Sequence, residues 1–223
     1  MRVLIFFLCF CISLSATTLK EKLARGAAGD YIVSKQEKNL SLLRIKEITP
    51  TSLLLEEISA PLSLLNPATC IWQKWIEEGA PGHSAWVIYE IDLRSGKLVT
   101  CYSPALGTWV SVDEPVLPKM LNLSLTPTPE DRRKRIGPPP RAGEEDHRSL
   151  WTPPLVFDGK KLARPFCEAL ETTWPKDGTD LSQCRLVFYF LPDFPFPCWI
   201  EASNGHFTFK IHTLASGRIK AEG

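Results

Sequence analysis

Hydrophobic and polar positions alternate along much of the chain, and this period of two residues predicts β-strands. Between residues 40 and 49, Leu43 and Ile45 alternate with basic residues, as expected where one face of a sheet is buried and the other contacts water. Short polar turns separate the strands of this first group. We therefore expect an antiparallel meander of three strands at residues 30–36, 40–49 and 52–58.

A second pattern, with helical spacing, interrupts this alternation. Asn66 can cap the start of a helix, Pro67 suits its first turn, and Gly79 can close its far end in a left-handed conformation. The apolar positions between them recur at intervals of three and four residues: Ile71, Trp72, Trp75 and Ile76. We therefore expect a helix over residues 67–78 that packs on the sheet, followed by a hairpin of strands at 84–92 and 97–103.

The last third of the chain returns to the strand pattern. Asn204-Gly205 is the sharpest turn signal in the sequence and favours a type I′ hairpin. The prolines of residues 192–197 cannot donate to a sheet ladder, so we expect that connection at a sheet edge or rim. The strands predicted here lie at residues 165–174, 183–191, 198–203 and 206–213, and one more strand is expected earlier, at 107–112.

Residues 113–154 have a different composition, with many prolines and with acidic and basic runs that nearly balance one another. We interpret this segment as a charged, solvated strap rather than as a nucleic-acid or membrane site. Its middle, residues 130–145, has few apolar side chains to offset the entropy of ordering, so we expect it to be mobile. Apolar residues near both ends, such as Leu117 and Trp151, predict that those ends are anchored to the sheet.

These patterns predict a mainly β fold, with curved antiparallel sheets of meander hairpins in a half-barrel-like arrangement and one packed α-helix. The expected organisation is a signal peptide at residues 1–15, a β meander with its helix at 16–112, the strap at 113–154, and C-terminal β hairpins at 155–223 packed on the first half. The sequence leaves open whether the two β halves share one sheet.

The start of the chain has the pattern of a secretory signal peptide. Met1-Arg2 precede a short apolar run over residues 3–14. Small residues at Ser13 and Ser15 predict cleavage near residues 15–16, and lipid modification of Cys11 is an alternative that the sequence leaves open. We therefore expect a periplasmic or secreted protein, with no transmembrane span after removal of the signal.

The 26 Lys and Arg residues of the chain balance its 25 Asp and Glu residues. A neutral chain lacks the excess positive charge that binding to nucleic acid requires. The sequence therefore argues against nucleic acid as a partner.

Five cysteines follow the predicted signal peptide, and export permits disulfides between them. They form one or two bridges or remain buried thiols, and at least one is free or intermolecular because their number is odd. The first two can meet if the helix packs as expected, and two of the last three can meet across neighbouring strands. The candidates for disulfides are Cys70, Cys101, Cys167, Cys184 and Cys198.

Recognised catalytic signatures are absent from the sequence, including the nucleophile elbow, the phosphate-binding glycine loop and the zinc-protease motif. The cysteines lack zinc-ligand spacing, so we expect no metal and no cofactor. The remaining nucleophile hypothesis joins Cys70 or Cys101 to His83, since a thiol needs a base or a positive neighbour to react at neutral pH. We therefore expect a protein that is not an enzyme, with a cysteine-dependent enzyme as the weaker alternative.

The chain is rich in aromatic residues, with seven tryptophans. Large apolar side chains at strand and helix positions usually belong to the core. A curved antiparallel sheet also leaves a concave aromatic interior, in which an apolar ligand can bind. The residues that we expect to line this cavity are Trp72, Trp75, Trp86, Trp109, Phe188, Trp199, Phe207 and Phe209.

The order of elements resembles a known class of proteins. Gly29-Asp30-Tyr31 opens the first strand, a long meander follows, and the predicted helix carries two tryptophans. In this order, over residues 29–112, the chain resembles exported half-barrel proteins of the lipoprotein-carrier (LolA/LolB-like) type, which implies an apolar ligand such as an acyl chain. Residues 133–148, with Trp-Pro-Lys-Asp-Gly at 174–178, also resemble an uncharacterised exported family, which implies no activity.

The function that these patterns favour is that of an exported binding protein of the bacterial cell envelope, which holds an apolar ligand or a lipidated partner in a concave aromatic sheet. The alternative is a protein–protein interaction module, either of the envelope or a secreted factor, whose exposed aromatic edge docks another protein. Recovery of bound lipid with the purified mature protein favours the first hypothesis. Capture of a protein partner by a lipid-free monomer favours the second.

Overall fold

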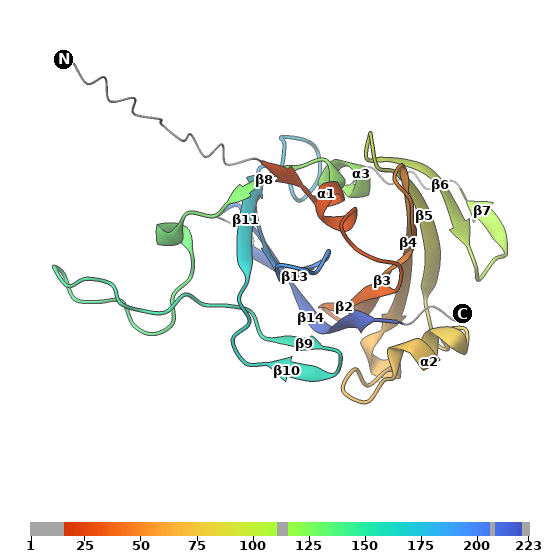
Figure 1. The fold of residues 1–223 in the computed structure, drawn as a ribbon, viewed down its shortest axis with the longest axis horizontal. Helices are drawn as coiled ribbons and strands as arrows, with labels where there is room; N and C mark the ends of the chain where they lie inside the picture. Colours follow the sequence, from red (N-terminus) through yellow and green to blue (C-terminus); the bar gives the residue numbers. More distant parts are fainter. Residues whose placement is uncertain (1–15, 111–115, 206–207, 220–223) are drawn as a thin grey trace, which may run out of the picture.

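The structure, a computed structural model, describes residues 16–110, 116–205 and 208–219 (Figure 1). Within these ranges the chain folds as one curved antiparallel sheet with three short α-helices, so the predicted mainly β fold is confirmed. The expected signal peptide lies outside the described residues. The strands of the first half are β2 (Asp30–Gln36), β3 (Asn39–Ile48), β4 (Ser52–Pro61), β5 (Ala85–Asp92), β6 (Lys97–Ser103) and β7 (Thr108–Val110).

The second half adds four long strands and several short elements. The long strands are β11 (Glu168–Thr173), β12 (Arg185–Phe190), β13 (Pro197–Ser203) and β14 (Thr208–Arg218). The short elements of the chain are β1 (Thr17–Thr18), β8 (Ser124–Pro127), β9 (Leu155–Phe157), β10 (Lys160–Leu162), α1 (Leu19–Leu23), α2 (Trp72–Glu77), α3 (Val116–Leu121), and the 3₁₀ turns η1 (Leu62–Leu64) and η2 (Glu130–Arg132).

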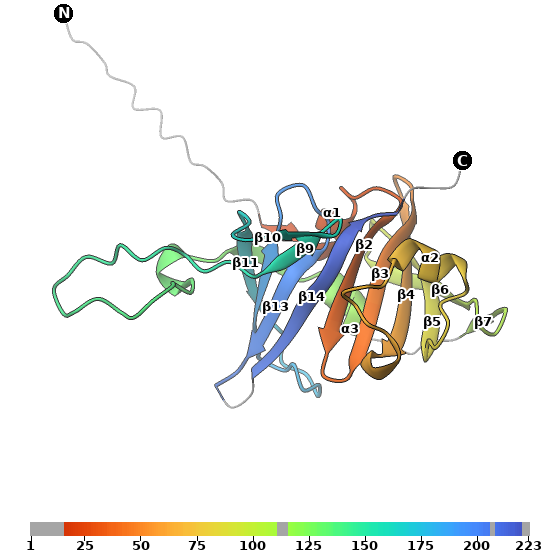
Figure 2. The ribbon, with the colours of Figure 1, turned by 90° about the horizontal axis from the view of Figure 1, so that it is seen from below.

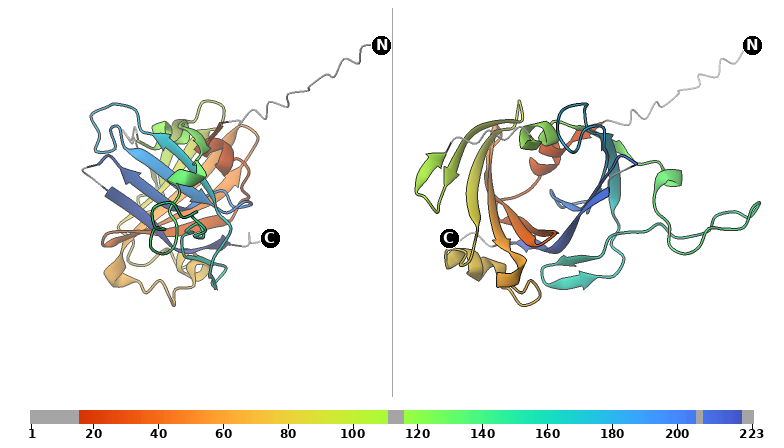
Figure 3. Two further views of the ribbon diagram at one scale, coloured as in Figure 1. Left: turned by 90° about the vertical axis from the view of Figure 1, so that its left-hand side faces the viewer. Right: turned by 180° about the vertical axis from the view of Figure 1, so that it is seen from behind.

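The two β halves share one sheet, because the last strand pairs with the first strand of the meander. β14 runs antiparallel to β2, with Arg218 opposite Asp30 and His212 opposite Lys35. The spatial order is β1-β8-β11-β12-β13-β14-β2-β3-β4-β5-β6-β7, and it leaves β1 and β7 as separate edges. The sheet therefore curls into an open half-barrel (Figures 1 and 3).

Several predicted boundaries agree with the structure. β2 and β6 begin and end at the predicted residues, and Asn204-Gly205 lie in the connection between β13 and β14. Ser203 pairs with Thr208, so this connection is longer than the two-residue type I′ turn that the sequence favours. β14 continues to Arg218, beyond its predicted end at residue 213, because a bulge between Thr213 and Ala215 lets the strand bend and continue. The strand expected at 107–112 is present as β7 in its described part, whereas residues 111–115 lie outside the described ranges.

The helix expected over residues 67–78 is shorter in the structure, where α2 spans only Trp72–Glu77. Asn66 caps a separate turn instead: its side-chain oxygen accepts from the Ala68 amide at 3.1 Å and its carbonyl from the Cys70 amide at 3.0 Å. This local turn satisfies the backbone groups that a longer helix would have used. Ile71, expected on the buried side, is 68% exposed, while Gly79 has the predicted left-handed conformation with φ 79°.

The first part of the strap segment is anchored to the sheet, as its apolar residues predicted, and it also adds regular elements to the fold. It contains α3 and β8, and β8 pairs with β1 and β11 near one edge of the sheet. Leu121 and Leu125 are both fully buried. Their burial confirms the expected anchoring of this end, since apolar side chains at these positions stabilise the order of a segment whose overall composition is polar. The sequence did not predict α3 and β8.

The later part of this segment projects from the body as an arm (Figure 1). At its base, Arg132 Nη1 lies 2.7 Å from Glu171 Oε1, and Lys134 forms an ion pair with Glu201. The basic run therefore contacts carboxylates of the sheet, which differs from the solvated strap that the sequence favours. The mobility expected for residues 130–145 stays a prediction, now restricted to the tip beyond the bridge between Arg135 and Leu150.

The inner core fills the concave side of the sheet. Phe188 and Phe190 on β12 are fully buried there, and the Trp174 ring is 1% exposed. α1 and α3 add Leu23 and Leu121 to the same cluster and lie on the open side of the half-barrel, between β8 and β6 (Figure 1). The concave side is thus packed with side chains.

The outer face carries two further apolar clusters, each under its own cover. Because side chains alternate across a strand, Ile32 belongs to the inner core whereas its neighbour Val33 faces outward. α2 covers the outer side of β2, β3 and β4, and Trp151 packs over β12 and β13 farther along the sheet. Between these two covers the β9–β10 hairpin lies beside β14 (Figure 2).

None of the helices within the described residues is long and apolar enough to span a membrane.

Candidate functional site

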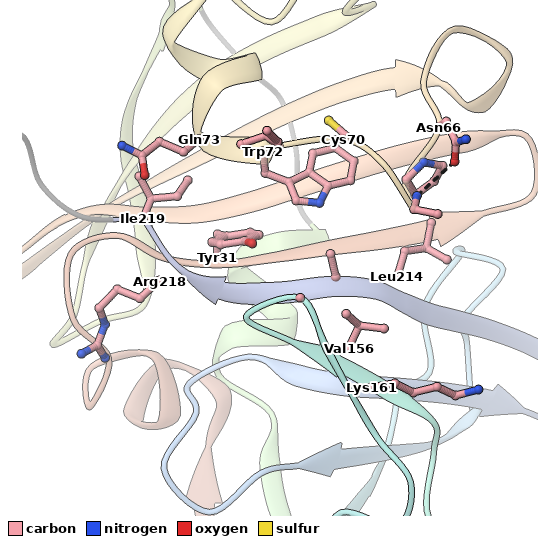
Figure 4. Close-up of a pocket in the computed structure, with 15 residues that line it drawn as sticks. Tyr31, Asn66, Cys70, Trp72, Gln73, Val156, Lys161, Leu214, Arg218 and Ile219 are labelled. Carbon is pink, nitrogen blue, oxygen red and sulfur yellow. Dashed lines mark hydrogen bonds between the residues drawn. The ribbon is translucent and has the colours of Figure 1, made fainter.

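An open groove of about 660 Å³ lies on the outer face between the segment that leads into α2 and the β9–β10 hairpin (Figure 4). We call it the outer groove. One wall is the segment that leads into α2, residues 66–73, and the other is the β9–β10 hairpin. The floor is formed by β2 and β14 through Tyr31, Leu214, Ala215 and Ile219.

The lining of the outer groove is predominantly apolar. Trp72 and Tyr31 present aromatic rings to it, and Val156 faces them from the hairpin wall (Figure 4). Ile71 also lines the groove and remains 68% exposed. An exposed isoleucine beside two aromatic rings provides contact area for an apolar ligand.

The hairpin wall is held against β14 by a close set of polar contacts. Ser216 Oγ donates to the Val156 carbonyl at 2.9 Å, and the Asp158 amide donates to the Ser216 carbonyl at 2.8 Å. The adjacent Gly217 leaves room for this approach, because a Cβ there would lie 2.1 Å from Asp158 Oδ1. A glycine on β14 therefore allows the hairpin to form one side of the groove.

Tyr31 on the floor and Cys70 in the wall before α2 are uncharged at neutral pH. Burial raises the pKa of the Tyr31 phenol, and the nearby Asp158 carboxylate raises it further. Burial also raises the pKa of the Cys70 thiol. Both groups stay protonated, so the middle of the groove carries no charge and Tyr31 can donate a hydrogen bond.

The two cations of the lining are Arg218 and Lys161, which lie toward opposite ends of the groove (Figure 4). Arg218 Nε donates to Asp30 Oδ1 at 2.7 Å, and this hydrogen bond is the main cause of the raised pKa of Arg218. Asp30 is only 2% exposed, so this ion pair compensates a buried carboxylate. Lys161 lies on the hairpin wall, on an exposed strand position.

The eight aromatic candidates do not gather in one cavity. Phe188 and Phe209 belong to the inner side, where Phe188 is part of the packed core. Trp75 on α2 and Trp86 on β5 pack in the outer cluster under this helix. Trp199 packs against Trp151 over β13. The expected concave aromatic cavity is therefore wrong in its composition, because neighbouring strand positions face opposite sides of the sheet.

Only Trp72 of these candidates lines the outer groove among the residues that the structure describes. Phe207 lies outside them. Trp109 is 63% exposed on β7 and lies against Tyr102, with ring centroids 5.3 Å apart. These two rings line a smaller hollow of about 290 Å³ near the β7 edge of the sheet.

The structure separates the first proposed cysteine pair and brings the second together. Cys70 packs against the outer cluster and Cys101 in the inner core, so the sheet lies between them. Cys167 and Cys198 are both buried with their Sγ atoms 4.0 Å apart, and all five cysteines of the described residues are free thiols. The meeting of two of the last three cysteines, which the sequence suggested, is thus seen for Cys167 and Cys198.

The nucleophile hypothesis finds no support in the local chemistry. Burial raises the pKa of both the Cys70 and the Cys101 thiols, whereas a reactive thiol needs a lowered pKa. His83 Nδ1 lies 2.9 Å from the Ala80 carbonyl, and its ring stacks edge-on against Trp86. Its contacts are those of a turn histidine.

Sequence reasoning missed most of the outer groove. The β9–β10 hairpin carries Asp158-Gly159 at its turn, a pair that is typical of tight hairpins and that could have revealed it. The sequence pattern marks Tyr31 only as a residue at the start of the first strand. No local signal indicates that β14 returns beside β2, so the floor could not be assembled from the sequence.

The open sheet, its packed concave side and its outer groove place the protein in the class of half-barrel β proteins. The chain belongs to the CT021 protein family, whose sequence profile matches residues 41–163. It is similar to the 2.0 Å structure of the hypothetical protein CT021 from Chlamydia trachomatis, with a TM-score of 0.65 and 19% identity over 94% of this chain and 98% of that chain. At this identity the likeness shows the fold alone.

No curated protein matches the chain. The family agrees with the resemblance of this sequence to an uncharacterised family, and the comparisons give no link to lipoprotein carriers.

Proposed function

We propose that this protein is an exported, non-enzymatic binding protein of the bacterial cell envelope that holds an apolar ligand or the lipid chain of a partner in the outer groove. The observation that carries the proposal is the groove itself: about 660 Å³, open to solvent, with an apolar floor beneath Trp72 and Tyr31. Its volume falls within the range of small-ligand sites. The resemblance to lipoprotein carriers also implies an apolar ligand, but we place its site on the outer side of the sheet rather than on the concave side.

The raised pKa values of the Cys70 and Cys101 thiols argue against the two nucleophiles that the sequence suggested. A hydrogen bond with Cys198 lowers the pKa of the Cys167 thiol, but both of these cysteines are buried away from the outer groove. The signal-like residues 1–15 support export, and the periplasm is the compartment that we propose. Packing on the concave side supports the placement of the ligand outside, because an acyl chain there would have to displace fully buried side chains such as Phe188.

A substitution at Ile71 tests the proposal without threatening the fold. Ile71 occupies the N-cap position of α2 and makes no cap hydrogen bond, so Ile71→Asp introduces a favoured capping residue and leaves α2 as stable as before or more so. The same carboxylate lies at the apolar wall and disfavours an apolar ligand. We expect the affinity for the uncharged fluorophore N-phenyl-1-naphthylamine to fall about tenfold, given roughly 0.8 kcal/mol per buried methylene.

The matched control is Leu106→Asp, which places the same charge on a 72% exposed apolar residue at the other end of the sheet. It should leave fluorophore binding unchanged. Native mass spectrometry of the mature protein, purified from cell envelopes, should also recover bound lipid with the wild type and less with Ile71→Asp. Equal loss in both variants, or absence of binding by the wild type, contradicts the proposal.

The second candidate function is a protein–protein interaction module, and the β7 edge favours it. β7 leaves one side of the sheet without a neighbouring strand in the described chain, and Val99, Leu106 and Trp109 are each at least 60% exposed beside it. Edge strands of this kind pair with extended segments of partners. In that case Leu106→Asp abolishes partner capture and Ile71→Asp does not, so the two variants exchange their roles as test and control.

A further inference from the structure

The outer groove has an uneven distribution of charge that narrows the class of ligand. Its lining includes the cations Lys161 and Arg218, and no Asp or Glu lines it among the described residues. The floor between the two cations is apolar and uncharged, because Tyr31 and Cys70 are protonated (Figure 4). Asp30 and Asp158 lie beside Arg218, so the positive charge that is not balanced locally is that of Lys161, and a wholly apolar ligand would make no use of it.

The two cations differ in their availability. Arg218 already compensates Asp30, which is 2% exposed and also accepts a hydrogen bond from the Ala27 amide. Lys161 stands opposite Val156 in the β9–β10 ladder, on an exposed position. No carboxylate of the described residues lies within ion-pair distance of the Lys161 ammonium, whereas its charge borders an apolar wall.

We propose that the ligand of the outer groove is an amphiphile with one apolar chain and an anionic head group, a carboxylate or a phosphate, and that Lys161 binds the head group. This inference rests on the proposed binding function. The chain then lies along Tyr31, Leu214 and Trp72, and the head group remains in solvent at the hairpin end. An ammonium ion at a solvated rim attracts an anion without the desolvation that a buried charge would cost.

The test compares ligands that differ only in head-group charge. Palmitate and methyl palmitate, each displacing N-phenyl-1-naphthylamine, have the same chain with and without a carboxylate, and lysophosphatidylglycerol supplies the phosphate. We expect the wild type to bind palmitate about three- to tenfold more tightly than the ester, as for an exposed charge pair, and to lose most of the difference at high salt. The ratio of palmitate to lysophosphatidylglycerol affinity distinguishes a free fatty acid from a lipid head group.

Adjacent lysines provide the variant and its control. Lys161→Gln should bring the affinities for palmitate and its ester together, with little change for the ester. Lys160 precedes it on β10, points to the other side of the strand and does not line the groove, so Lys160→Gln should preserve the preference for the anion. Both positions are exposed, and neither substitution should affect folding.

The outcomes separate this inference from the function on which it rests. If the wild type binds palmitate and its ester equally well, the groove binds apolar chains but the head-group inference is wrong. If Lys160→Gln and Lys161→Gln reduce the preference equally, the effect is one of general charge and Lys161 is not the head-group site. Absence of binding to every probe, including the uncharged fluorophore, contradicts the proposed function instead.

Discussion

The two faces of the sheet use the same strands for different purposes. On the concave side, residues such as Phe188 and Phe190 are fully buried in a core to which α1 and α3 also contribute. On the outer side, α2 and the β9–β10 hairpin stand apart and leave the outer groove above β2 and β14. Ile32 and Val33, adjacent on β2, belong to the two different faces. A curved sheet therefore does not by itself indicate a ligand on its concave side.

Because the two faces differ in burial, substitutions on one face should change stability and substitutions on the other should change ligand binding. The concave side provides most of the large buried side chains, so substitutions there should act on folding. The walls of the outer groove include exposed positions, so substitutions there should act on ligand binding with little effect on folding.

The largest effect is expected for Phe188→Ala, which removes a fully buried ring from the inner core. The free energy of unfolding should fall by about 3–5 kcal/mol, because the packed surroundings cannot close the resulting cavity. Urea denaturation of the wild type, Phe188→Ala and the groove variant Ile71→Asp measures the contrast. A loss of free energy of unfolding below about 1 kcal/mol for Phe188→Ala would show that the concave side is loosely packed. The concave side would then again be a candidate for the ligand site.

A smaller effect is expected for Gly217→Ala, which targets the wall of the groove. The added methyl would lie 2.1 Å from Asp158 Oδ1, so the Asp158 side chain must turn away and lose its hydrogen bond from the Arg218 amide, which loosens the β9–β10 hairpin on β14. We expect a loss of about 1–3 kcal/mol, typical of overpacking, together with faster tryptic cleavage at Lys160 and Lys161 and weaker fluorophore binding.

Gly178→Ala is the matched control, because a Cβ at Gly178 would meet no atom within 4 Å. It should change neither the cleavage rate nor binding. Undiminished binding by Gly217→Ala would mean that the hairpin is not a functional wall of the groove.

The third prediction concerns the effect of acid on the contact between α3 and the loop that follows β11. Hydrogen bonds from Lys119 on α3, and then from Thr179, hold the pKa of Asp177 well below its usual range. A carboxyl whose pKa is lowered by folding stabilises the folded state above its unfolded pKa, near 4, and this contribution is lost as the pH falls through the lowered value. The difference in Tm between wild type and Asp177→Asn should therefore be present at pH 7 and shrink below about pH 4.

Asp180→Asn removes an exposed carboxylate from the same loop without touching the Lys119 contact, and it serves as the control. Tyr31 and Cys70 in the outer groove keep their protons throughout this pH range. Acid should therefore weaken the α3 contact before it changes the protonation of these two groups. If the Tm difference stays the same across the whole pH range, the ionised Asp177 carboxylate does not stabilise the contact between α3 and the core.

Local features of the fold could be read directly from the sequence. The alternation at Leu43 and Ile45 indicated a strand with two unlike faces, and Asn204-Gly205 located the turn before β14. One further signal was present but unused: Thr18 and Glu21 form a capping box at the start of α1, a pattern readable from their spacing. Each of these features depends on residues that are close together in the chain.

The tertiary structure alone decided how these pieces combine. The pairing of Asp30 with Arg218 joins residues from opposite ends of the described chain, and no periodicity encodes such a partner. Alternation shows that a strand has two faces, but the curvature of the whole sheet determines which face is concave and which carries the groove. Tyr31, Trp72 and Lys161 line one groove because three separate segments fold against a single strand, β14, and such long-range contacts leave no local pattern in the sequence.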